Sequence, residues 1–539
     1  MKKLARLLAI SKLSQKDKNW VHKDLFRILS KDEIWIAAYE KLEGNTGALT
    51  PESNPSTMDG MSLIRLKNLK ESVYSETYLF KPFKLTFIPR PDNRKRPLGL
   101  LTANDKIVQQ VIYLILEAIY EPIFSKHSFG FRAELGLGCH YALSHVEQKF
   151  RWVDYVVESE IKQSYPTIDH QILINILEKR IDDVRFIRLI RKLLKCDILF
   201  EERIAWSKTG VSQKSIVSPI LSNIYYDELD RFVQQLIKQY STSKNYRRNF
   251  KSAEYKTLEH EILKLSKEMN ILAPQSPERK ECSKILKILR AKRLAVLSLK
   301  NKITRIEYVR YVDDWMVGVA GDRQLAHQIK AELTIFMKDT LLQKLHPTKA
   351  KVSNLRKGNV YFLGYEIFLP HNRPISGYKG KGTGTIRRGQ PRLRFDIPIN
   401  IIIERYTNQG YLKKLEKGVR PISRASYTTL EDHVIVSHYR SLWLGILNYY
   451  SGCTKRGRLQ YIHCLLHMSC AMTLAHRHRS SSQKIFQKHG KYLKVKIPNH
   501  DKTVEFPYKT TWRWEEREWL LGKSVVAQTF RYSNLVSSS

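Results

Sequence analysis

Residues 306–320 read Ile-Glu-Tyr-Val-Arg-Tyr-Val-Asp-Asp-Trp-Met-Val-Gly-Val-Ala. Two runs rich in β-branched and aromatic residues flank the dipeptide Asp313-Asp314, which predicts two strands joined by a tight turn. Adjacent carboxylates between apolar strands repel each other unless a cation lies between them, and Mg²⁺ prefers such hard oxygen ligands. An Asp-Asp turn alone is more often a solvated turn. Tyr-x-Asp-Asp between strands, here at 311–314, is more specific and suits two-metal phosphoryl transfer.

The composition favours a large basic protein that binds a polyanion. Of the 539 residues, 93 are Lys or Arg and 52 are Asp or Glu, which gives a formal net charge of +41. Such an excess repels itself, so we expect a nucleic acid as the constant partner. Aromatic residues make up 10% of the chain, and phosphate neutralisation combined with base stacking suits RNA. A ribosomal or chromatin protein would also be basic, so charge alone leaves that class open.

The cysteines and the apolar runs bear on the compartment. The six cysteines form no C-x-x-C pair, so neither a zinc ribbon nor a disulfide framework is indicated, and a reducing compartment is the simplest interpretation. No run of about 18 apolar residues occurs, so we expect no transmembrane helix and no membrane partner. The first 16 residues carry five basic residues and no acid. They are interpreted either as an organelle-targeting segment or as a docked N-terminal helix.

Hydrophobic patterning predicts the elements around the acidic turn. Strands are expected at 84–90 and 152–157, and helices at 104–124, 169–180, 183–195, 219–240 and through most of 396–490. Residues 241–300 carry 15 Lys or Arg against six acids, which predicts a helical insertion with a solvated basic face, split near Pro274 and Pro277. Residues 371–394 carry seven Lys or Arg, no acid and several glycines, which predicts a flexible basic arm.

Further sequence blocks surround the turn in a fixed order, over about residues 40–495. The blocks are Asn-Thr-Gly-Ala-Leu-Thr at 45–50 with Met58-Asp59-Gly60, Ile88-Pro89-Arg90 with Arg96-Pro97-Leu98-Gly99, Ser-Phe-Gly-Phe-Arg at 128–132, Gly-Val-Ser-Gln-Lys-Ser-Ile-Val-Ser-Pro at 210–219 with Leu-Ser-Asn-Ile-Tyr at 221–225, Lys349, Phe-Leu-Gly-Tyr at 362–365, and Gly-Ile-Leu-Asn-Tyr-Tyr-Ser at 445–451. Together with the turn they resemble the blocks of group II intron-encoded reverse transcriptases and maturases of the mitochondrial-like lineage.

The resemblance implies the fold class and the division of the chain. The expected fold is α/β: a right-hand reverse-transcriptase fingers–palm with a C-terminal α-helical thumb, also called domain X. The expected domains are an N-terminal extension with the first block at 1–75, the fingers–palm domain at 76–370 with the basic helical insertion at about 241–305, the basic flexible arm at 371–395, the thumb or domain X (maturase) at 396–500, and a C-terminal tail at 501–539.

The resemblance also implies the site residues. Asp313, Asp314 and Glu160 match the catalytic carboxylates that hold Mg²⁺ in a polymerase-active member. The matching nucleotide-binding residues are Tyr165, Arg90, Arg96, Gln213 and Lys349, and general RNA-backbone contact is the less favoured alternative for the two arginines. The expected RNA-binding residues are Tyr449, Tyr450, Lys455, Arg456, Arg458, Arg387 and Arg388. One of the two tyrosines is expected to pack between helices instead of stacking on a base.

Several positions depart from the family pattern. Glu160 stands where the family has a catalytic Asp, Pro166 where it has a second acid, and Ser212-Gln213-Lys214 where it has Pro-Gln-Gly. Ala133-Glu134 replaces a Pro-Gly pair. Glu keeps the charge but adds one methylene, and a misplacement of about 1 Å in a catalytic site can lower a rate on the order of 10²-fold. Polymerase activity is therefore left open.

The sequence thus predicts a group II intron maturase that binds intron RNA and promotes its splicing. The alternatives are an active RNA-directed DNA polymerase that supports intron mobility, with a DNA target or primer as a further partner, and a general organellar RNA chaperone. We expect no endonuclease activity, because no paired-cysteine His-Asn-His pattern follows residue 495. We expect an organelle, with mitochondrion favoured over plastid and the bacterial cytoplasm left open. The oligomeric state is not fixed by the sequence, and a homodimer is one option.

Overall fold

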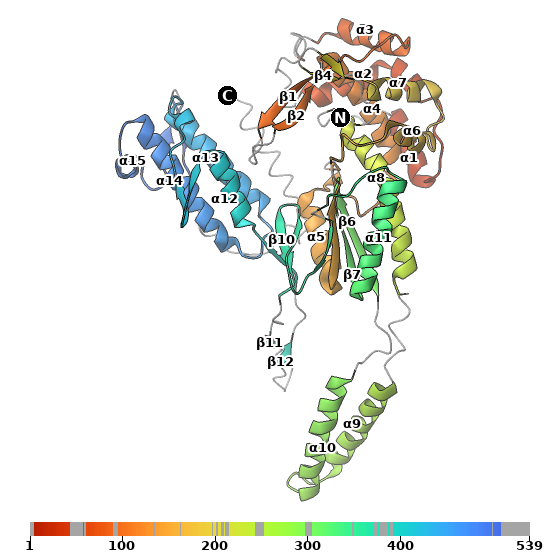
Figure 1. The fold of residues 1–539 in the computed structure, drawn as a ribbon, viewed down its shortest axis with the longest axis vertical. Helices are drawn as coiled ribbons and strands as arrows, with labels where there is room; N and C mark the ends of the chain where they lie inside the picture. The colour runs from red at the N-terminus through yellow and green to blue at the C-terminus, as the bar shows by residue number, and fades with distance from the viewer. Residues whose placement is uncertain are drawn as a thin grey trace.

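The structure is a computed structural model, and the fold is followed over the residues whose placement it describes. These are 5–43, 58, 61–89, 95–132, 135–161, 163–196, 198–200, 203–205, 210, 215–242, 253–296, 304–347, 350–370, 375–377, 386–388, 392–498 and 500–507. Figure 1 shows three groups of elements: an N-terminal helical lobe, a central sheet with its helices, and a C-terminal helical group, with a separate two-helix hairpin beyond the end of the sheet.

The central sheet contains the strands that the acidic turn predicts. It is antiparallel, in the order β6-β7-β3-β8, with β3 at Tyr155–Glu160, β6 at Arg305–Tyr311, β7 at Asp314–Ala320 and β8 at Lys351–Asn354. Strands β6 and β7 confirm the predicted strand, turn and strand. Strand β3 begins three residues after the predicted start, because residues 150–152 form a 3₁₀ turn, η3 (Phe150–Trp152).

Both faces of this sheet are buried, which explains why its strands read as continuous apolar runs. Side chains alternate between the faces along a strand. One face packs on α8 (Ser218–Tyr240) and α11 (Arg323–Asp339), and it contributes Tyr308, Trp315 and Val317 to one core. The other face packs on α5 (Cys139–Lys149) and contributes Val309 and Met316 to a second core that continues into the C-terminal helices.

The N-terminal lobe is helical. Helix α4 (Ala103–Tyr120) confirms the helix predicted at 104–124, and α6 (His170–Glu178) and α7 (Val184–Leu194) confirm the next two. The remaining elements of the lobe are α1 (Ala5–Lys16), η1 (Phe26–Ser30), α2 (Asp32–Glu43) and α3 (Leu63–Tyr74). Helix α1 buries Ile10 and Ser14, and Ile10 belongs to the first core, which fits the docked-helix interpretation of the N-terminal segment.

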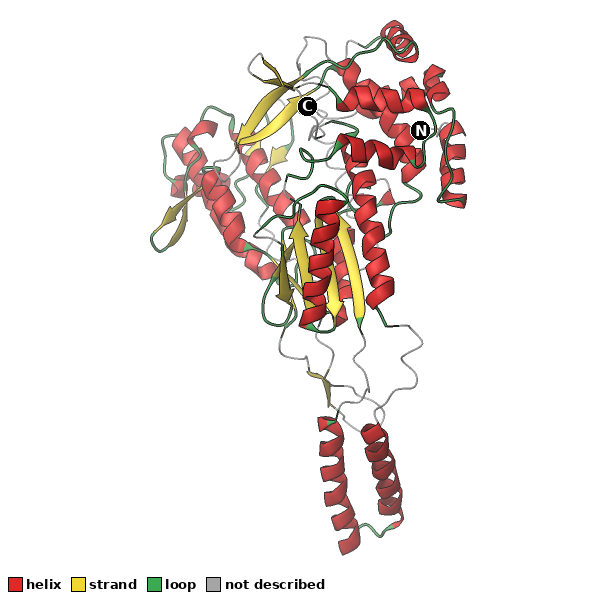
Figure 2. Ribbon diagram, turned by 45° about the vertical axis from the view of Figure 1, so that its right-hand side comes forward, coloured by secondary structure: helices red, strands yellow, loops and turns green. Residues whose placement is uncertain are grey.

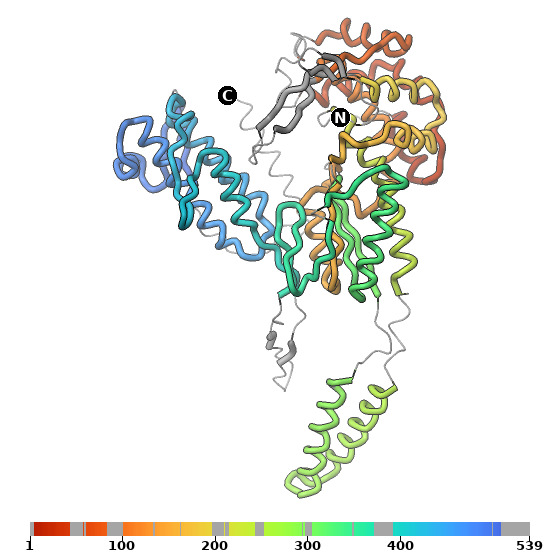
Figure 3. The backbone as a smooth tube through the Cα atoms, viewed as in Figure 1, coloured from red at the N-terminus to blue at the C-terminus, as the bar shows by residue number. Residues whose placement is uncertain are grey.

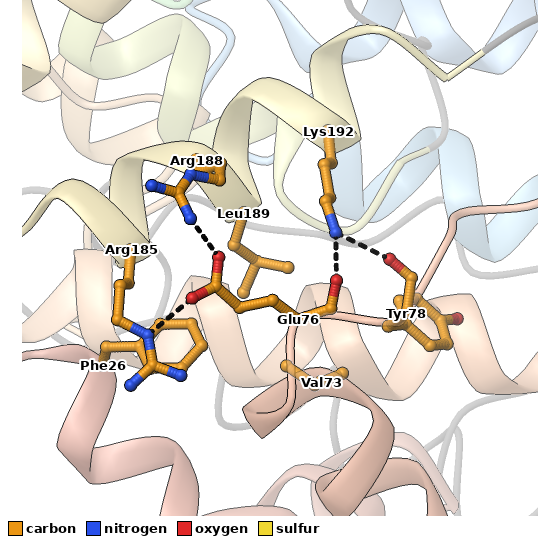
Figure 4. Close-up of a pocket in the computed structure, with 8 residues that line it drawn as sticks. All are labelled: Phe26, Val73, Glu76, Tyr78, Arg185, Arg188, Leu189 and Lys192. Atoms are coloured by element: carbon orange, nitrogen blue, oxygen red, sulfur yellow. Dashed lines mark hydrogen bonds and ion pairs between the residues drawn. The ribbon is translucent and has the colours of Figure 1, made fainter.

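A cluster of basic side chains on α7 joins two parts of this lobe (Figure 4). The Arg185 Nε lies 2.7 Å from Glu76 Oε1, and Arg188 Nη1 lies 2.6 Å from Glu76 Oε2. Lys192 Nζ donates to the Glu76 carbonyl, and the two guanidinium groups lower the pKa of the Glu76 carboxyl. Because these three cations of α7 all contact Glu76, this cluster joins α7 to the residues that follow α3.

A second, smaller sheet lies beside the lobe, in the order β2-β1-β4-β5. Its strands are β1 (Phe83–Pro89), β2 (Lys95–Leu100), β4 (Ile198–Phe200) and β5 (Arg203–Ala205). Strand β1 confirms the strand predicted at 84–90 for all residues but Arg90, which lies outside the described residues.

The C-terminal group is reached through the sheet β13-β10-β9. These strands are β9 (Val360–Phe362), β10 (Tyr365–Phe368) and β13 (Arg394–Asp396). Helices α12 (Ile399–Asn408), α13 (Asp432–Tyr449), α14 (Leu459–Arg477) and α15 (Ser482–His489) follow (Figure 3). The short elements among and after them are the hairpin β14–β15 (Leu412–Leu415 and Gly418–Pro421), η5 (Ala425–Tyr427), η6 (Arg456–Arg458), and β16–β17 (Val495–Lys496 and Thr503–Val504).

Two basic segments leave the body of the protein. The insertion forms α9 (Ala253–Ile271) and α10 (Pro277–Ala295), which confirms a helical insertion split near Pro274 and Pro277. Within the predicted basic arm, β11 (Ile375–Gly377) and β12 (Ile386–Arg388) pair antiparallel. Backbone pairing between the two short strands, which composition does not reveal, orders them.

Candidate active site

The acidic turn joins β6 to β7 through a strained backbone. Tyr311 is paired with Asp314 across the turn, and Val312 between them has φ +61°. Left-handed backbone is unfavourable for a β-branched residue, so the surrounding structure must hold it in place. The neighbouring contacts show how this is done.

Arg310, at the end of β6, is the group that holds the turn. Its side chain is fully buried (0% exposed), as is that of Asp230 on α8. The guanidinium Nε and Nη2 donate to the two oxygens of Asp230 at 2.7 Å each, and Nη1 donates to the Val312 carbonyl at 3.0 Å. A bidentate pair of this kind fixes orientation as well as distance. The pair therefore connects α8 directly to the backbone of the acidic turn.

Further buried hydrogen bonds complete this network. Tyr308 Oη donates to Asp230 Oδ1 at 2.7 Å, Asn223 Oδ1 accepts from Arg310 Nη1 at 3.2 Å, and Asn223 Nδ2 donates to the Gly130 carbonyl at 2.9 Å. Burial disfavours the charged guanidinium, but Asp230 outweighs it and raises the pKa of Arg310 above its usual range. Burial, reinforced by the charge of Asp230, raises the pKa of the neighbouring Asp227 to about 6.

Gly130 packs closely against Val312, the strained residue of the turn. A Cβ atom at this position would lie 2.4 Å from Val312 Cγ2 and 2.7 Å from the Val312 nitrogen. These separations are far below van der Waals contact, so only glycine fits here without moving the turn. The block at 128–132 is thus placed directly against the acidic turn, although 180 residues of sequence separate them.

The third predicted carboxylate lies on the adjacent strand. Glu160 is directly opposite Asp314 in the β3–β7 ladder, and the Ile161 nitrogen donates to the Asp313 carbonyl at 3.3 Å. Directly opposed residues project from the same face of a sheet, about 5 Å apart at Cβ, where like charges repel. The Leu363 nitrogen donates to Asp314 Oδ2 at 3.4 Å. Within the described part of the chain, no three His, Cys, Asp or Glu side chains form a group that could hold a metal ion.

The loop after Glu160 meets the predicted template block. Tyr165 is half-buried and Pro166 is exposed. A Cβ atom on Gly210, which has φ +104°, would lie 2.8 Å from the Pro166 carbonyl oxygen. The Gly210 nitrogen donates to the Ile168 carbonyl at 2.8 Å. The structure therefore brings the start of the 210–219 block against the residues that follow Tyr165.

The remaining nucleotide-site predictions are only partly within the described residues. Arg90, Gln213 and Lys349 lie outside them. Arg96 is in β2 opposite Ile88 in β1, on the smaller sheet. The predicted RNA-binding residues Arg387 and Arg388 are in β12, opposite Ser376 and Ile375.

The two tyrosines at the end of α13 differ in burial. Tyr450 is 8% exposed and donates to the Gly364 carbonyl at 3.3 Å, so it is the tyrosine that packs. Tyr449 is 38% exposed, and its hydroxyl donates to the Leu363 carbonyl at 2.8 Å. Because the Leu363 nitrogen in turn donates to Asp314, two hydrogen bonds through Leu363 connect the end of α13 to the acidic turn.

The predicted basic residues after α13 lie at and within the 3₁₀ turn η6. Arg456 donates to the Ser451 carbonyl, and Arg458 Nη1 lies 3.4 Å from Asp396 Oδ2. Lys455 is exposed. His140, on α5, was not predicted, yet its Nε2 lies 2.8 Å from the Tyr449 carbonyl oxygen. No sequence signal identified it, because the pairing spans 309 residues.

The sequence did carry a signal for the buried network. Arg310 stands between the apolar residue Val309 and Tyr311 in its strand, and a buried cation there requires an acidic partner. Asp230, on an amphipathic helix, is such a partner. Elsewhere, no helix among those described is long and apolar enough to cross a bilayer.

Two family models match the chain in succession. The one described as "Reverse transcriptase (RNA-dependent DNA polymerase)" matches residues 88–367, which include the central sheet and the acidic turn. The one described as "Type II intron maturase" matches residues 390–536, which include α12 to α15.

Several known proteins are similar along most of the chain. The group II intron-encoded protein LtrA of Lactococcus lactis subsp. cremoris is 31% identical over 487 residues, covering 89% of this chain and 79% of LtrA. The uncharacterized 91 kDa protein in the cob intron of Schizosaccharomyces pombe is 31% identical over 93% of this chain and 61% of that protein. The putative COX1/OXI3 intron 1 protein of Saccharomyces cerevisiae is 30% identical over 91% of this chain and 57% of that protein.

Removing Asp230 tests the role of the buried ion pair in stability. We expect Asp230→Ala to lower the free energy of unfolding by about 3–5 kcal/mol, because it leaves the Arg310 charge buried without its partner. Asp182→Ala is the control, since its partner Lys23 and Asp182 itself are both exposed, and such pairs contribute about 0–1 kcal/mol. Chemical denaturation measures both. Equal losses for the two variants would contradict the structural role of the pair.

Adding one methyl group tests the contact beneath the turn. We expect Gly130→Ala to lower stability by about 1–3 kcal/mol, because the new Cβ overpacks against Val312. Gly138→Ala is the matched control, because a Cβ there meets no heavy atom within 4 Å. Thermal melts compare the two. If Gly130→Ala melted like Gly138→Ala, the tight contact at the turn would be refuted.

Proposed function

Because this chain belongs to the family of group II intron-encoded maturases that carry a reverse-transcriptase domain, we propose that it binds its host intron RNA and stabilises the splicing-competent fold. A protein that binds a folded RNA in preference to the unfolded RNA shifts the equilibrium toward the fold by mass action. The formal net charge of +41 provides the electrostatic part of that binding.

The observation that carries this proposal is the well-packed maturase region. Helices α12, α13 and α14 share one core, in which Tyr439, Trp443 and Leu466 are buried. Tyr439 Oη lies 2.9 Å from both Ser469 Oγ and Thr473 Oγ1, which joins α13 to α14. A region that keeps this packing and stays joined to the sheet through Tyr449 and Tyr450 is a rigid platform for RNA.

The proposed domain arrangement is that of a right hand. The residues at 76–370 are the fingers and palm, with the central sheet as palm, and those at 396–500 are the thumb or domain X. The extension at 1–75, the arm at 371–395 and the tail at 501–539 complete the division. Support comes from the second core, which runs without a break from the palm sheet into α12 to α14.

The proposed roles of the site residues follow the family motif. Asp313, Asp314 and Glu160 would hold Mg²⁺, which supplies activation of a hydroxyl nucleophile and stabilisation of the leaving phosphate oxygens. Carboxylate oxygens are the ligands that a hard cation prefers, and the like charges of Glu160 and Asp314 on adjacent strands favour one, although the three side chains are not gathered into a metal-binding group among the described residues. Tyr165, Arg90, Arg96, Gln213 and Lys349 are the proposed nucleotide contacts. Tyr449, Lys455, Arg456, Arg458, Arg387 and Arg388 are proposed RNA contacts, while Tyr450 serves packing.

The partners and the compartment are proposed on the same basis. The intron RNA is the main partner, and a DNA target or primer would be used only by an active polymerase. An organelle is favoured because relatives include a Marchantia polymorpha mitochondrial protein and proteins of yeast introns, although LtrA is bacterial. A homodimer is kept as one option for the assembly.

A second candidate function is RNA-directed DNA synthesis. It is favoured by the retained Asp313–Asp314 turn and by the buried Arg310 network that holds the turn in place. Glu160 and the substituted template block argue against ordinary rates. A general RNA chaperone is the third alternative, and binding to unrelated RNAs with equal affinity would favour it.

Splicing of the host intron tests the leading proposal. At Mg²⁺ concentrations too low for self-splicing, we expect the purified protein to increase the rate, because it stabilises the folded RNA. The rate is measured with a labelled precursor transcript. An unrelated group II intron of similar length is the control, and acceleration of both introns alike would favour a general chaperone over a dedicated maturase.

Primer extension on an RNA template tests the second function. We expect little extension by the natural protein and a gain on the order of 10²-fold with Glu160→Asp, since the shorter side chain restores the carboxylate position of the family. Asp313→Asn in the Glu160→Asp background is the control for contaminating polymerase. Vigorous extension by the natural protein would rank polymerase activity above the present proposal.

A further inference from the structure

The hairpin formed by α9 and α10 stands apart from the rest of the described structure. In both Figure 1 and Figure 2 it lies beyond the end of the central sheet, away from the other helices. The two helices pack on each other, with Ile262 on α9 and Leu286 on α10 buried between them. This small apolar contact adds nothing to the two main cores, so the fold of the body does not explain why the hairpin is present.

Charge is divided unequally between the two helices. Helix α9 carries three lysines and four glutamates, whereas α10 carries seven lysines or arginines and two glutamates. One helix is therefore close to neutral and its neighbour strongly basic. Composition over 241–300 averages the two and hides this difference.

Two of the seven cations of α10 make contacts within the hairpin, and the other five, which include Arg290 and Lys292, are exposed. Arg279 Nη1 donates to the Leu272 carbonyl at 2.9 Å, and the Arg293 guanidinium lies 6.0 Å from the ring centre of Tyr255. Both lie on the side that faces α9 and serve the hairpin itself. Lys280, Lys284 and Lys287 are exposed, and none of the three forms an ion pair within the described residues.

These three lysines form a stripe on one helical face. Residues spaced four and three apart lie above one another, and at 1.5 Å per residue the stripe extends about 10 Å along the axis. Leu286 is buried against α9, whereas the three lysines are exposed, so they lie on the side of α10 that faces away from α9. We name Lys280, Lys284 and Lys287 the α10 stripe.

The α10 stripe is unfavourable for the isolated helix. Lys280 and Lys284 are like charges at i,i+4, and Lys284 and Lys287 are like charges at i,i+3, each pair destabilising a helix by about 0.2–0.5 kcal/mol. Lys280 also lies near the positive end of the helix dipole. By contrast, three arginines of α7 each have an acidic contact within the protein: Arg185 and Arg188 contact Glu76, and Arg191 contacts Glu178.

We propose that the α10 stripe is a docking surface for the phosphate backbone of RNA, and that α9 takes no part in it. The inference deepens the proposed function, on which it rests, by assigning one face of one helix to the RNA. Lysine is a point charge that suits phosphate without reading base identity. Helix α10 contains no Phe, Tyr or Trp, so base stacking is not its mode of contact.

The experiment compares two triple variants of the full-length protein. The stripe variant is Lys280→Gln, Lys284→Gln and Lys287→Gln. The control variant is Lys256→Gln, Lys264→Gln and Lys267→Gln on α9, where all three lysines are also exposed and the change in net charge is the same. Filter binding over a range of salt concentrations uses two probes: a transcript of the host intron and an RNA duplex of unrelated sequence.

The stripe variant is expected to bind both probes about tenfold more weakly or worse, with a log–log salt slope smaller by about two to three, because three phosphate contacts are lost. The control variant is expected to bind within about twofold of the natural protein. Thermal melts of the stripe variant should be unchanged or higher, because like charges have been removed, so weaker binding cannot be unfolding.

Each outcome separates this inference from the proposed function. If the natural protein fails to bind the intron transcript, the proposed function fails. If the natural protein binds and the stripe variant binds equally well, the stripe does not contact RNA and the inference is overturned. Equal weakening of both variants also overturns it, because net charge and not the outward face of α10 would then set affinity.

Discussion

The buried pair of Arg310 and Asp230 is the interaction on which the centre of the molecule depends. It joins α8, the helix that carries the sequence block at 221–225, to β6, the strand that leads into the acidic turn. Arg310 also donates a hydrogen bond to the carbonyl of the strained residue Val312. A buried ion pair is not a reliable source of stability, because both charges lose their hydration. Its effect here is geometric, because it fixes two segments of the chain that are 80 residues apart relative to each other.

Contacts far apart in the sequence also fix the C-terminal helices relative to the acidic turn. Tyr449 and Tyr450 rest on the turn between β9 and β10, and the backbone of that turn contacts Asp314. The maturase helices, which are the proposed RNA-binding region, and the acidic turn are therefore parts of one packed unit. A protein that had lost polymerase chemistry would still need the turn, because the maturase helices are seated against it. This offers a physical reason for a retained Asp-Asp pair beside a substituted third carboxylate.

Much of the fold could be predicted from the sequence, because long amphipathic helices and the apolar strands around Asp313 have strong periodicity. The helices at 103–120 and 184–194 and both strands of the turn were found within a few residues. The hairpin at 412–421 was missed, since four-residue strands with exposed lysines carry little pattern. An arginine inside the strand indicates that a buried partner exists, but tertiary contact determines which acid it is, so the local sequence does not identify Asp230 as the partner of Arg310.

The central claim is that the protein stabilises the folded form of its host intron. The most direct measurement is the Mg²⁺ concentration at which the intron RNA folds, followed by hydroxyl-radical footprinting at increasing protein concentration. The account predicts that the midpoint moves to lower Mg²⁺ as protein is added and stops moving once the RNA is saturated. A midpoint that stays constant while the protein is demonstrably bound would contradict it, because the protein would then bind folded and unfolded RNA equally.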